Sequence, residues 1–214
     1  MGTHLLFHIS FYKNLDSIFS NGELASHIKV QEQKVGYTNI AHQGLQERRS
    51  TTVIPVEPNG CLHDYVPFYF APRSPMLYAI KQGRVIDFDG SQDDIVYFVT
   101  STDKVVDAGL SFVFTDGHAI MFITDFYNDI HDLDKVDWDI MKEIYWNDTE
   151  EDPDRKRRRQ AEFLVHERIG LEHFLGIAVR NERMKEIVED KVKNYKLDLP
   201  VVVRPRFYFT HQKV

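Results

Sequence analysis

The apolar residues of this chain occur in short runs, and the longest of them have the length of a single β-strand. The run Ile95-Val96-Tyr97-Phe98-Val99 consists of the β-branched and aromatic residues that favour strands. A transmembrane helix needs about 18 apolar residues in succession, so the sequence predicts no membrane span. With 43% hydrophobic and 28% charged residues among 214, the composition is that of a globular protein rather than a disordered one. We therefore expect one domain over residues 1–214.

The N-terminal residues and the cysteine content are used to predict the cellular compartment of the protein. The chain begins Met-Gly-Thr-His, which lacks the basic region and cleavage site of a signal peptide. Cys61 is the single cysteine, so no disulfide can form within the chain. We expect a cytoplasmic protein. The net charge of −7 argues against a general nucleic-acid coat, although local basic clusters can still bind phosphate.

Hydrophobic periodicity predicts strands and helices in irregular succession, which favours an α+β fold. Alternation over residues 4–10 places Leu6, His8 and Ser10 on one face of a strand and an apolar set on the other, which we assign to the core. Further strands are expected at 62–70, 94–100, 112–115, 161–167, 174–179 and 200–209, and helices at 12–20, 38–49, 75–82, 103–108, 124–146 and 182–195.

Two charged stretches have no clear periodicity. Residues 28–60 are polar apart from the helix expected near 38–49, which is typical of a mobile segment or one that a ligand orders. Residues 147–160 change from an acidic run at 148–152 to a basic run at 155–159. This pattern predicts a solvated loop or the start of a helix.

Glu162 is a carboxylate at the start of an otherwise apolar strand. Burial of an unpaired carboxylate costs several kcal/mol, so Glu162 needs either a cleft or a partner. A glutamate at the entry of a strand is usually an edge residue in water, but the basic run just before it favours a site here. His8 and Ser10 share a face that could line a cleft, although a histidine in a strand is more often structural.

Aromatic and basic clusters allow two interpretations each. The run Tyr65–Phe70 could stack on bases, but its composition is more typical of a core, with Pro67 indicating an edge strand. Arg48-Arg49 and the basic run could neutralise phosphates. A charge run is normally a solvated face, and the neighbouring acidic run could simply pair with it.

Common cofactor motifs are absent from the sequence. The ten histidines include no pair at metal-ligand spacing with a carboxylate, so no metal site is expected. Neither Gly-x-Gly-x-x-Gly nor Gly-x4-Gly-Lys-Ser/Thr occurs. These absences disfavour a Rossmann dehydrogenase, a P-loop enzyme and a zinc deaminase.

Five segments form a specific combination in their order along the chain. They are Phe7-His8-Ile9-Ser10 with Asn14-Leu15, Gln46-Glu47-Arg48-Arg49, the 17-residue block LHDYVPFYFAPRSPMLY at 62–78, Phe112-Val113-Phe114-Thr115-Asp116, and Gln160-Ala161-Glu162-Phe163-Leu164-Val165. This combination resembles the DarT family, the DNA ADP-ribosyltransferase toxins of DarT/DarG toxin–antitoxin pairs. The resemblance extends from about residue 5 to residue 209.

The resemblance implies an ADP-ribosyltransferase fold, a split mixed β core with peripheral helices that binds NAD in a central cleft as co-substrate, without a metal. Residues about 30–50 would close over NAD, and residues about 117–162 would recognise the substrate. The family usually has Thr in place of Ser10, a change that keeps the hydroxyl group. The implied NAD-binding residues, of which His8 to Ser10 would hold the adenosine-side ribose, are His8, Ile9, Ser10, Asn14, Ser17, Leu24 and Arg49.

The resemblance also implies the acceptor and the partner. ADP-ribose would be transferred to a base in single-stranded DNA, commonly thymine and in some branches guanine, by a toxin whose antitoxin is the macrodomain protein DarG. Glu162 and Arg49 would be catalytic. The implied DNA-binding residues are Tyr69, Arg73, His118, Arg157 and Arg158.

The chemistry of this reaction explains the two catalytic residue types. Breaking the nicotinamide–ribose bond develops oxocarbenium character, which a carboxylate such as Glu162 stabilises. Nicotinamide leaves as a neutral molecule and needs no general acid, but the incoming base nitrogen must lose a proton. The family gives this task to the arginine that matches Arg49. A guanidinium is not deprotonated at neutral pH, so stabilising an anionic base is its easier role, and the exact role stays open.

Two alternatives remain beside transfer to DNA. The same cleft chemistry could serve transfer to protein or RNA, because loops select the acceptor. A non-catalytic single-strand-binding module could use Arg49, the basic run and the aromatic strand, but it would not need Glu162. A ring nitrogen on the Watson–Crick edge is paired in a duplex, so the DNA interpretation requires an unpaired base.

Overall fold

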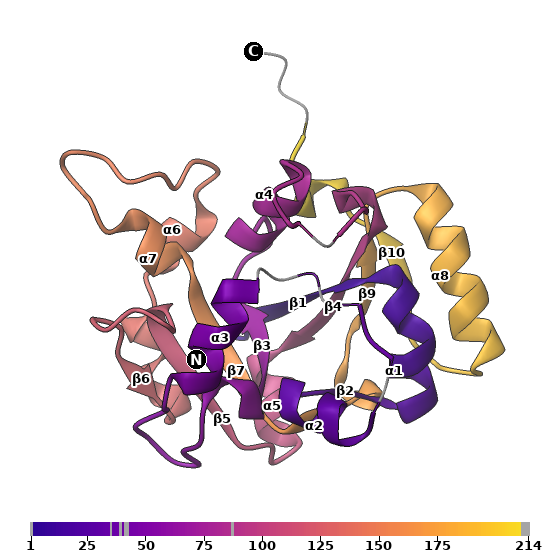
Figure 1. Cartoon of the computed structure of the whole chain (residues 1–214), viewed down its shortest axis with the longest axis horizontal. Coiled ribbons are helices and arrows are strands. Elements are labelled where there is room, and N and C mark those ends of the chain that lie inside the picture. The colour runs from indigo at the N-terminus through magenta and orange to yellow at the C-terminus, as the bar shows by residue number, and fades with distance from the viewer. Residues whose placement is uncertain (1, 35, 39, 41–42, 87, 211–214) are drawn as a thin grey trace.

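The structure, a computed structural model of the chain, describes residues 2–34, 36–38, 40, 43–86 and 88–210. In these residues the strands form an eight-stranded mixed sheet of order β10-β9-β4-β1-β3-β7-β5-β6 and a two-stranded sheet β2-β8 (Figure 1). The strands are β1 (Leu5–Phe11), β2 (Glu23–Ala25), β3 (Tyr65–Tyr69), β4 (Ile95–Ser101), β5 (Phe112–His118), β6 (Phe126–Tyr127), β7 (Ala161–His166), β8 (Arg168–Gly170), β9 (Gly176–Val179) and β10 (Val201–Val203). This mixture of strands and helices confirms the α+β prediction.

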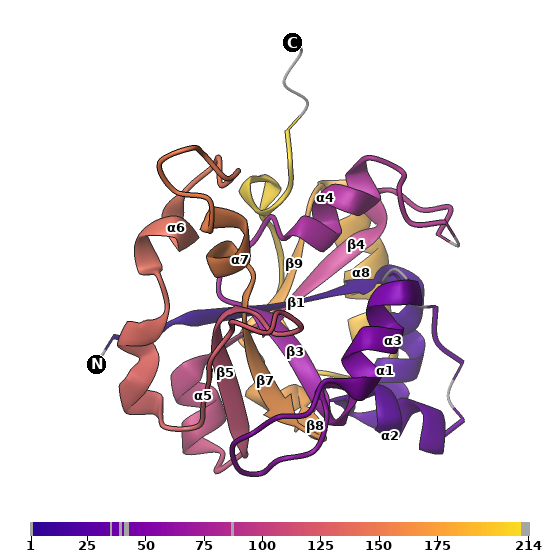
Figure 2. The same ribbon diagram turned by 60° about the vertical axis from the view of Figure 1, so that its left-hand side comes forward.

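Short helices surround the sheet (Figure 2). The α-helices are α1 (Leu15–Asn21), α2 (His27–Glu32), α3 (Gln43–Thr51), α4 (Pro75–Lys81), α5 (Thr102–Asp107), α6 (Trp138–Lys142), α7 (Arg155–Arg159) and α8 (Glu182–Asn194). The 3-10 helices are η1 (Tyr12–Asn14), η2 (Leu62–Asp64), η3 (Gln92–Asp94), η4 (Ile130–Lys135), η5 (Leu171–His173) and η6 (Pro205–Phe207). Within the described ranges, no helix has both the length and the apolar character needed to cross a membrane.

Local sequence signals explain several of these helices. The side chain of Ser74 accepts a hydrogen bond from the Leu77 N–H, and Pro75 occupies the first turn, so α4 begins where the Ser-Pro pair predicts. Gly22 ends α1 in the left-handed conformation, with φ +71°. One stripe of α8, which includes Met184 and Val188, is buried against β9 and β10.

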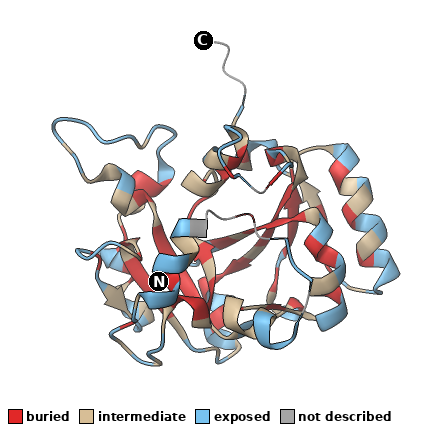
Figure 3. Ribbon diagram, viewed as in Figure 1, coloured by how far each residue is buried: buried red, intermediate tan, exposed pale blue. Residues whose placement is uncertain are grey.

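The sheet splits between its two central strands, β1 and β3. Strand β1 pairs with β4 over its whole length, from Leu5↔Ser101 to Phe11↔Ile95, but its register with β3 holds only Phe7↔Tyr69. Both faces of β1 are covered, as Leu6 is 0% exposed and Phe7 4% (Figure 3). The apolar face that was predicted to join the core does so at Phe7 and Ile9, whereas Leu5 at its start is exposed. The opposite face is also buried at Leu6 and Ser10, because an internal strand is packed on both sides.

Strand β3 is also internal, so the edge-strand interpretation of Pro67 is wrong. Pro67 instead lies in the part of β3 that has no register pair with β1. Tyr65 and Phe68 are almost fully buried, which confirms the core interpretation of this aromatic run. The strand is shorter than predicted, because residues 62–64 form η2.

The helix expected at 124–146 does not form. Phe126 and Tyr127 pair with β5 as β6, and the rest is divided into η4 and α6. The side chains of Asp129 and Asp137 accept hydrogen bonds from the backbone at the start of η4 and α6. Aspartates that bond to nearby backbone N–H groups start short helices and compete with a continuous one. In the same way, the strand expected at 200–209 ends at Val203, before η6.

A change of register in β5 positions the start of β7. Phe114 faces Phe163, but the next register pair is His118↔Ala161, where an unshifted ladder would place Asp116. Thr115, which is fully buried, holds this irregularity: its hydroxyl donates to Gly117 O at 2.7 Å and accepts from Glu162 N at 3.0 Å. The bulge therefore fixes the backbone of Glu162 and brings His118 next to it.

We predict that Thr115→Val destabilises the protein by about 2 kcal/mol, because the Gly117 carbonyl and the Glu162 N–H would both be buried without a partner. Thr115→Ser is the control, since it keeps the hydroxyl and removes one methyl group, at a cost of about 1 kcal/mol or less. Urea unfolding of the three proteins measures both effects. A Val variant as stable as the Ser variant would contradict the bulge assignment.

Candidate active site

A first pocket opens where β1 and β3 separate. Residues from both strands, from α1 to α3 and from β7 line it. The structure brings the implied NAD-binding residues and the candidate catalytic residues together here: His8, Ile9, Ser10, Asn14, Ser17, Leu24, Arg49 and Glu162. They come from segments that are up to 154 positions apart in sequence (162 minus 8), so only the folded sheet assembles them.

Arg49 and Glu162 form a buried ion pair at the floor of this pocket. Arg49 Nη1 lies 2.9 Å from Glu162 Oε2 and 3.1 Å from Oε1. Their side chains are only 10% and 4% exposed. A carboxylate buried in this way requires such a partner. Arg49 Nη2 is buried and has no hydrogen-bond partner among the described residues, so it is a donor available to a ligand.

His8 is held in one tautomer. Its Nδ1 lies 2.8 Å from Pro67 O, across the split between β1 and β3. Because a carbonyl oxygen can only accept, Nδ1 carries the proton and the neutral ring presents Nε2 as an acceptor. Burial lowers the pKa of His8, which favours this neutral form. The ring can therefore accept a hydrogen bond from a hydroxyl group of a ligand.

Asn14 connects the pocket wall to the segment expected to cover NAD. Its Nδ2 donates to Thr38 O at 3.0 Å, and its Oδ1 accepts from Thr38 N at 2.9 Å. Both hydrogen-bonding groups of the side chain thus bind the covering segment. Residues 35, 39, 41 and 42 of the predicted 30–50 segment lie outside the described residues.

A second pocket adjoins the first at Leu45, Tyr69 and Met76, which line both. Of the implied DNA-binding residues, Tyr69, His118 and Arg157 line the second pocket, whereas Arg73 and Arg158 do not. Arg48, Met76 and Gln160 lie in its wall as well. Burial raises the pKa of Tyr69, so its hydroxyl stays protonated and can donate.

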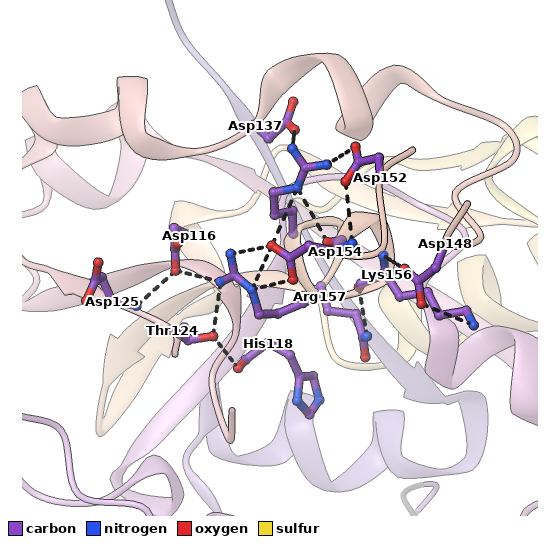
Figure 4. Close-up of polar contacts among 12 residues, drawn as sticks. Asp116, His118, Thr124, Asp125, Asp137, Asp148, Asp152, Asp154, Lys156 and Arg157 are labelled. Carbon is purple, nitrogen blue, oxygen red and sulfur yellow. Dashed lines mark hydrogen bonds and ion pairs between the residues drawn. The ribbon is translucent and has the colours of Figure 1, made fainter. Parts of the chain in front are cut away.

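Three of the five residues of the basic run 155–159 form ion pairs within the protein (Figure 4). Arg157 bonds to Asp154 and Asp116, Arg158 to Asp137 and Asp152, and Lys156 to Asp148. This arrangement matches the alternative in which the acidic run pairs with the basic one. A direct role of Arg157 and Arg158 in DNA binding stays a prediction, and it would require these guanidinium groups to exchange partners.

His63 is a pocket residue that sequence reasoning missed. Its Nε2 donates to Gln46 Oε1 at 2.8 Å, and its ring centroid lies 4.3 Å from that of His27. It thereby joins η2 to both α2 and α3. Burial and the nearby His27 and Arg49 lower the pKa of His63 to about 4. Nothing in the spacing of these residues marks them, because their contact depends on how three separate segments pack.

Comparison with known proteins agrees with this geometry. The family model for DarT, described as ssDNA thymidine ADP-ribosyltransferase, matches residues 7–209. A DNA ADP-ribosyl transferase of Thermus sp. strain 2.9 is 38% identical over 201 residues, which are 94% of this chain and 91% of the relative. A DNA ADP-ribosyl transferase-DNA ADP-ribosyl glycohydrolase fusion protein of Thermosipho africanus is 23% identical and spans 95% of this chain and 49% of the fusion.

Solved structures of Thermus sp. 2.9 DarT have the same fold. The complex with ADP-ribosylated ssDNA superimposes with a TM-score of 0.89 at 36% identity and covers 96% of both chains. The complex with NAD+ gives a TM-score of 0.84 at 33% identity and covers 96% of this chain and 98% of that one. The predicted ADP-ribosyltransferase fold is confirmed. The chain belongs to the DarT family of ssDNA thymidine ADP-ribosyltransferases.

Proposed function

We propose that this chain transfers the ADP-ribose unit of NAD to a thymine base in single-stranded DNA and releases nicotinamide. The observation that carries the proposal is the buried Arg49–Glu162 pair at the floor of the first pocket, beside the Tyr69 that both pockets share. The Thermus structures with NAD+ and with ADP-ribosylated ssDNA support both substrates.

The first pocket provides groups that fit NAD. His8 Nε2 accepts a hydrogen bond from a ribose hydroxyl, and the Ser10 side chain lies on the same face of β1. Arg49 Nη2 supplies a buried donor. The Glu162 carboxylate accepts from a ribose hydroxyl and stabilises the positive charge that develops at the anomeric carbon. Because nicotinamide leaves as a neutral molecule, the protein needs no acid to expel it.

The second pocket is the place for the acceptor base. It meets the first pocket at Tyr69, whose register partner on β7 is Glu162, so a base in this pocket lies beside the ribose held in the other. Such a base must be unpaired, because its Watson–Crick edge has to face the anomeric carbon. Transfer to protein or RNA remains the alternative acceptor.

The fusion protein of Thermosipho africanus supports a partner. It joins a DNA ADP-ribosyl transferase to a DNA ADP-ribosyl glycohydrolase, an activity that removes the modification. We propose that this chain acts as a toxin whose antitoxin is a macrodomain protein of the DarG type. A cytoplasmic location follows from the proposal, because DNA and NAD are both found there.

The function is tested by incubating the protein with NAD and single-stranded oligonucleotides of varied sequence. We expect release of nicotinamide that depends on DNA, and oligonucleotides whose mass increases by one ADP-ribose unit only where thymidine is present. Mass spectrometry measures both products. Nicotinamide release without any modified DNA would contradict the proposal.

We predict that Glu162→Gln lowers the transfer rate by about two to three orders of magnitude, because the cation at the anomeric carbon loses its carboxylate. The glutamine can still bond to Arg49 and fill the same volume, so the fold and NAD binding should persist. Glu162→Ala would in addition leave the buried Arg49 without a partner and so tests stability as well. Transfer by the Gln variant at nearly the wild-type rate would overturn the catalytic assignment.

We predict that His8→Ala weakens NAD binding more than DNA binding, because His8 lines the first pocket and not the second. The pH dependence has a definite sign. The pKa of His8 is lowered, so NAD affinity should stay constant above pH 6.5 and fall only at lower pH, where Nε2 gains a proton. Calorimetry across pH measures this, and unchanged affinity in the variant would refute the placement.

We predict that annealing a complementary strand suppresses modification strongly, because both the enzyme and the complement need the same edge of the base. The comparison uses one thymidine-containing oligonucleotide, free and annealed, at equal concentration. A complementary strand with a mismatch opposite the target base should allow part of the activity to return. Equal modification of duplex and single strand would instead favour the protein-directed alternative.

A further inference from the structure

The loop between β5 and β6 carries three consecutive apolar side chains into solvent. Met121 is 42% exposed, Phe122 103% and Ile123 63%. We call these three residues the apolar tip. Single exposed apolar residues are common on protein surfaces, but a contiguous cluster that includes a fully exposed aromatic ring is typical of a binding surface. The apolar tip therefore points to a ligand that covers it.

The backbone of this loop is fixed, although the tip is exposed. Ile120 packs against a buried cluster beneath the loop. The His118 carbonyl accepts from Met121 N at 2.9 Å and from Thr124 Oγ1 at 2.9 Å. Arg157 Nη1 in turn donates to Thr124 Oγ1, as Figure 4 shows. A turn held in this way presents its side chains to a ligand at little further cost in backbone entropy.

The apolar tip lies at the rim of the second pocket. Ile120, Met121 and Ile123 line this pocket, whereas Phe122 does not. Since both chain neighbours of Phe122 belong to the pocket wall and its own side chain is fully exposed, the phenyl ring lies outside the pocket, beside the wall. A DNA strand whose target base occupies the pocket has its next nucleotide at the rim. The ring is therefore available to that nucleotide and not to the target base.

The charges around the apolar tip favour a nucleic acid as this ligand. Arg48 Nη2 bonds to Ile120 O at 3.4 Å, and within the described ranges Arg48 forms no ion pair, so its charge is available to a phosphate. Lys156 and Arg157 in the same wall are paired with aspartates. One available cation beside an exposed aromatic ring suits a few nucleotides of a single strand. Segments that bind a lipid surface carry many free cations instead.

We propose that the Phe122 ring is a stacking site for the nucleobase next to the target thymine in the DNA strand. This inference rests on the proposed function and adds a second contact between the strand and the protein. The neighbouring base stacks on the phenyl ring, and Arg48 donates to a phosphate of the same strand. Stacking tolerates any base, because every base has an aromatic face. The site therefore holds the strand in place and does not read its sequence.

The test compares wild-type protein with Phe122→Ala, Phe122→Trp and a control, Ile86→Ala, which changes an apolar residue that is 91% exposed and lines neither pocket. The acceptor is a single-stranded oligonucleotide with one thymidine that the wild-type protein modifies. We expect Phe122→Ala to raise the KM for DNA about ten-fold or more, with the kcat and the KM for NAD little changed. Phe122→Trp keeps an aromatic face, so it and Ile86→Ala should retain the wild-type KM for DNA.

Abasic acceptors identify the base that stacks. In two further oligonucleotides an abasic site replaces the base on the 5′ side or on the 3′ side of the target thymidine. For wild-type protein, loss of the stacked base should raise the KM for DNA by about the same factor as Phe122→Ala does. In Phe122→Ala the same abasic site should have little further effect, because its stacking partner is already absent. Such non-additivity is expected of two groups in direct contact.

The outcomes separate this inference from the proposed function. Wild-type transfer together with an unchanged KM for DNA in Phe122→Ala, or with fully additive effects of both abasic sites, overturns the stacking site alone. Wild-type protein that modifies no oligonucleotide contradicts the proposed function, and the inference with it. Sedimentation velocity checks the other use of an apolar tip: wild-type protein that self-associates, with Phe122→Ala monomeric and unchanged in its DNA kinetics, would show a contact between proteins and overturn the stacking site.

Discussion

The ion pair between Arg49 and Glu162 connects α3 to the sheet at the first pocket. Arg49 belongs to α3, above the split of the sheet, and Glu162 opens β7 within the sheet. Neither charge could be buried alone, because desolvation of an unpaired ion costs several kcal/mol. The pair therefore allows a carboxylate to lie buried in the wall of the first pocket, where its field acts through a medium of low dielectric constant. The carboxylate oxygens have further lone pairs that can accept from a ligand while the ion pair persists, and the unpartnered Nη2 of Arg49 is a donor available to the same ligand.

The geometry around this pair comes from irregularities in an otherwise regular sheet. The single register pair between β1 and β3 opens the first pocket, and His8 bridges the opening to Pro67. On the other side, the bulge in β5 is held by Thr115, which fixes the backbone of Glu162 and advances His118 to the same level. A regular ladder would close the opening and face β7 with Asp116. The polar side chains that line the pockets therefore lie at the two points where the strand pairing is irregular.

In the segment 117–162, which was predicted to recognise the substrate, most of the basic run is paired with acidic side chains of the protein itself. The basic run that suggested a phosphate-binding surface forms α7. The side chains of Lys156, Arg157 and Arg158 bond to aspartates from the preceding loop, from the N-cap of α6 and from β5 (Figure 4). Arg157 bonds both to Asp116 of β5 and to Thr124 in the loop after it, so this guanidinium group holds the loop against the strand. Arg157, which lines the second pocket, is held in place there by its ion pairs with Asp116 and Asp154.

The sequence by itself determined the class of fold, the positions of most strands, the start of α4 and the family, because these depend on local periodicity and on short motifs. It also singled out Glu162 as a carboxylate that needs a partner. Only the tertiary structure decided that the partner is Arg49, which lies 113 positions away in the chain. It also decided that β1 and β3 are internal strands, that three residues of the basic run are paired, and that His63 contacts both α2 and α3. The physical reason is the same for each of these features. Burial, ion pairing and hydrogen bonding of a side chain depend on which distant segments pack together, and local sequence patterns do not encode that packing.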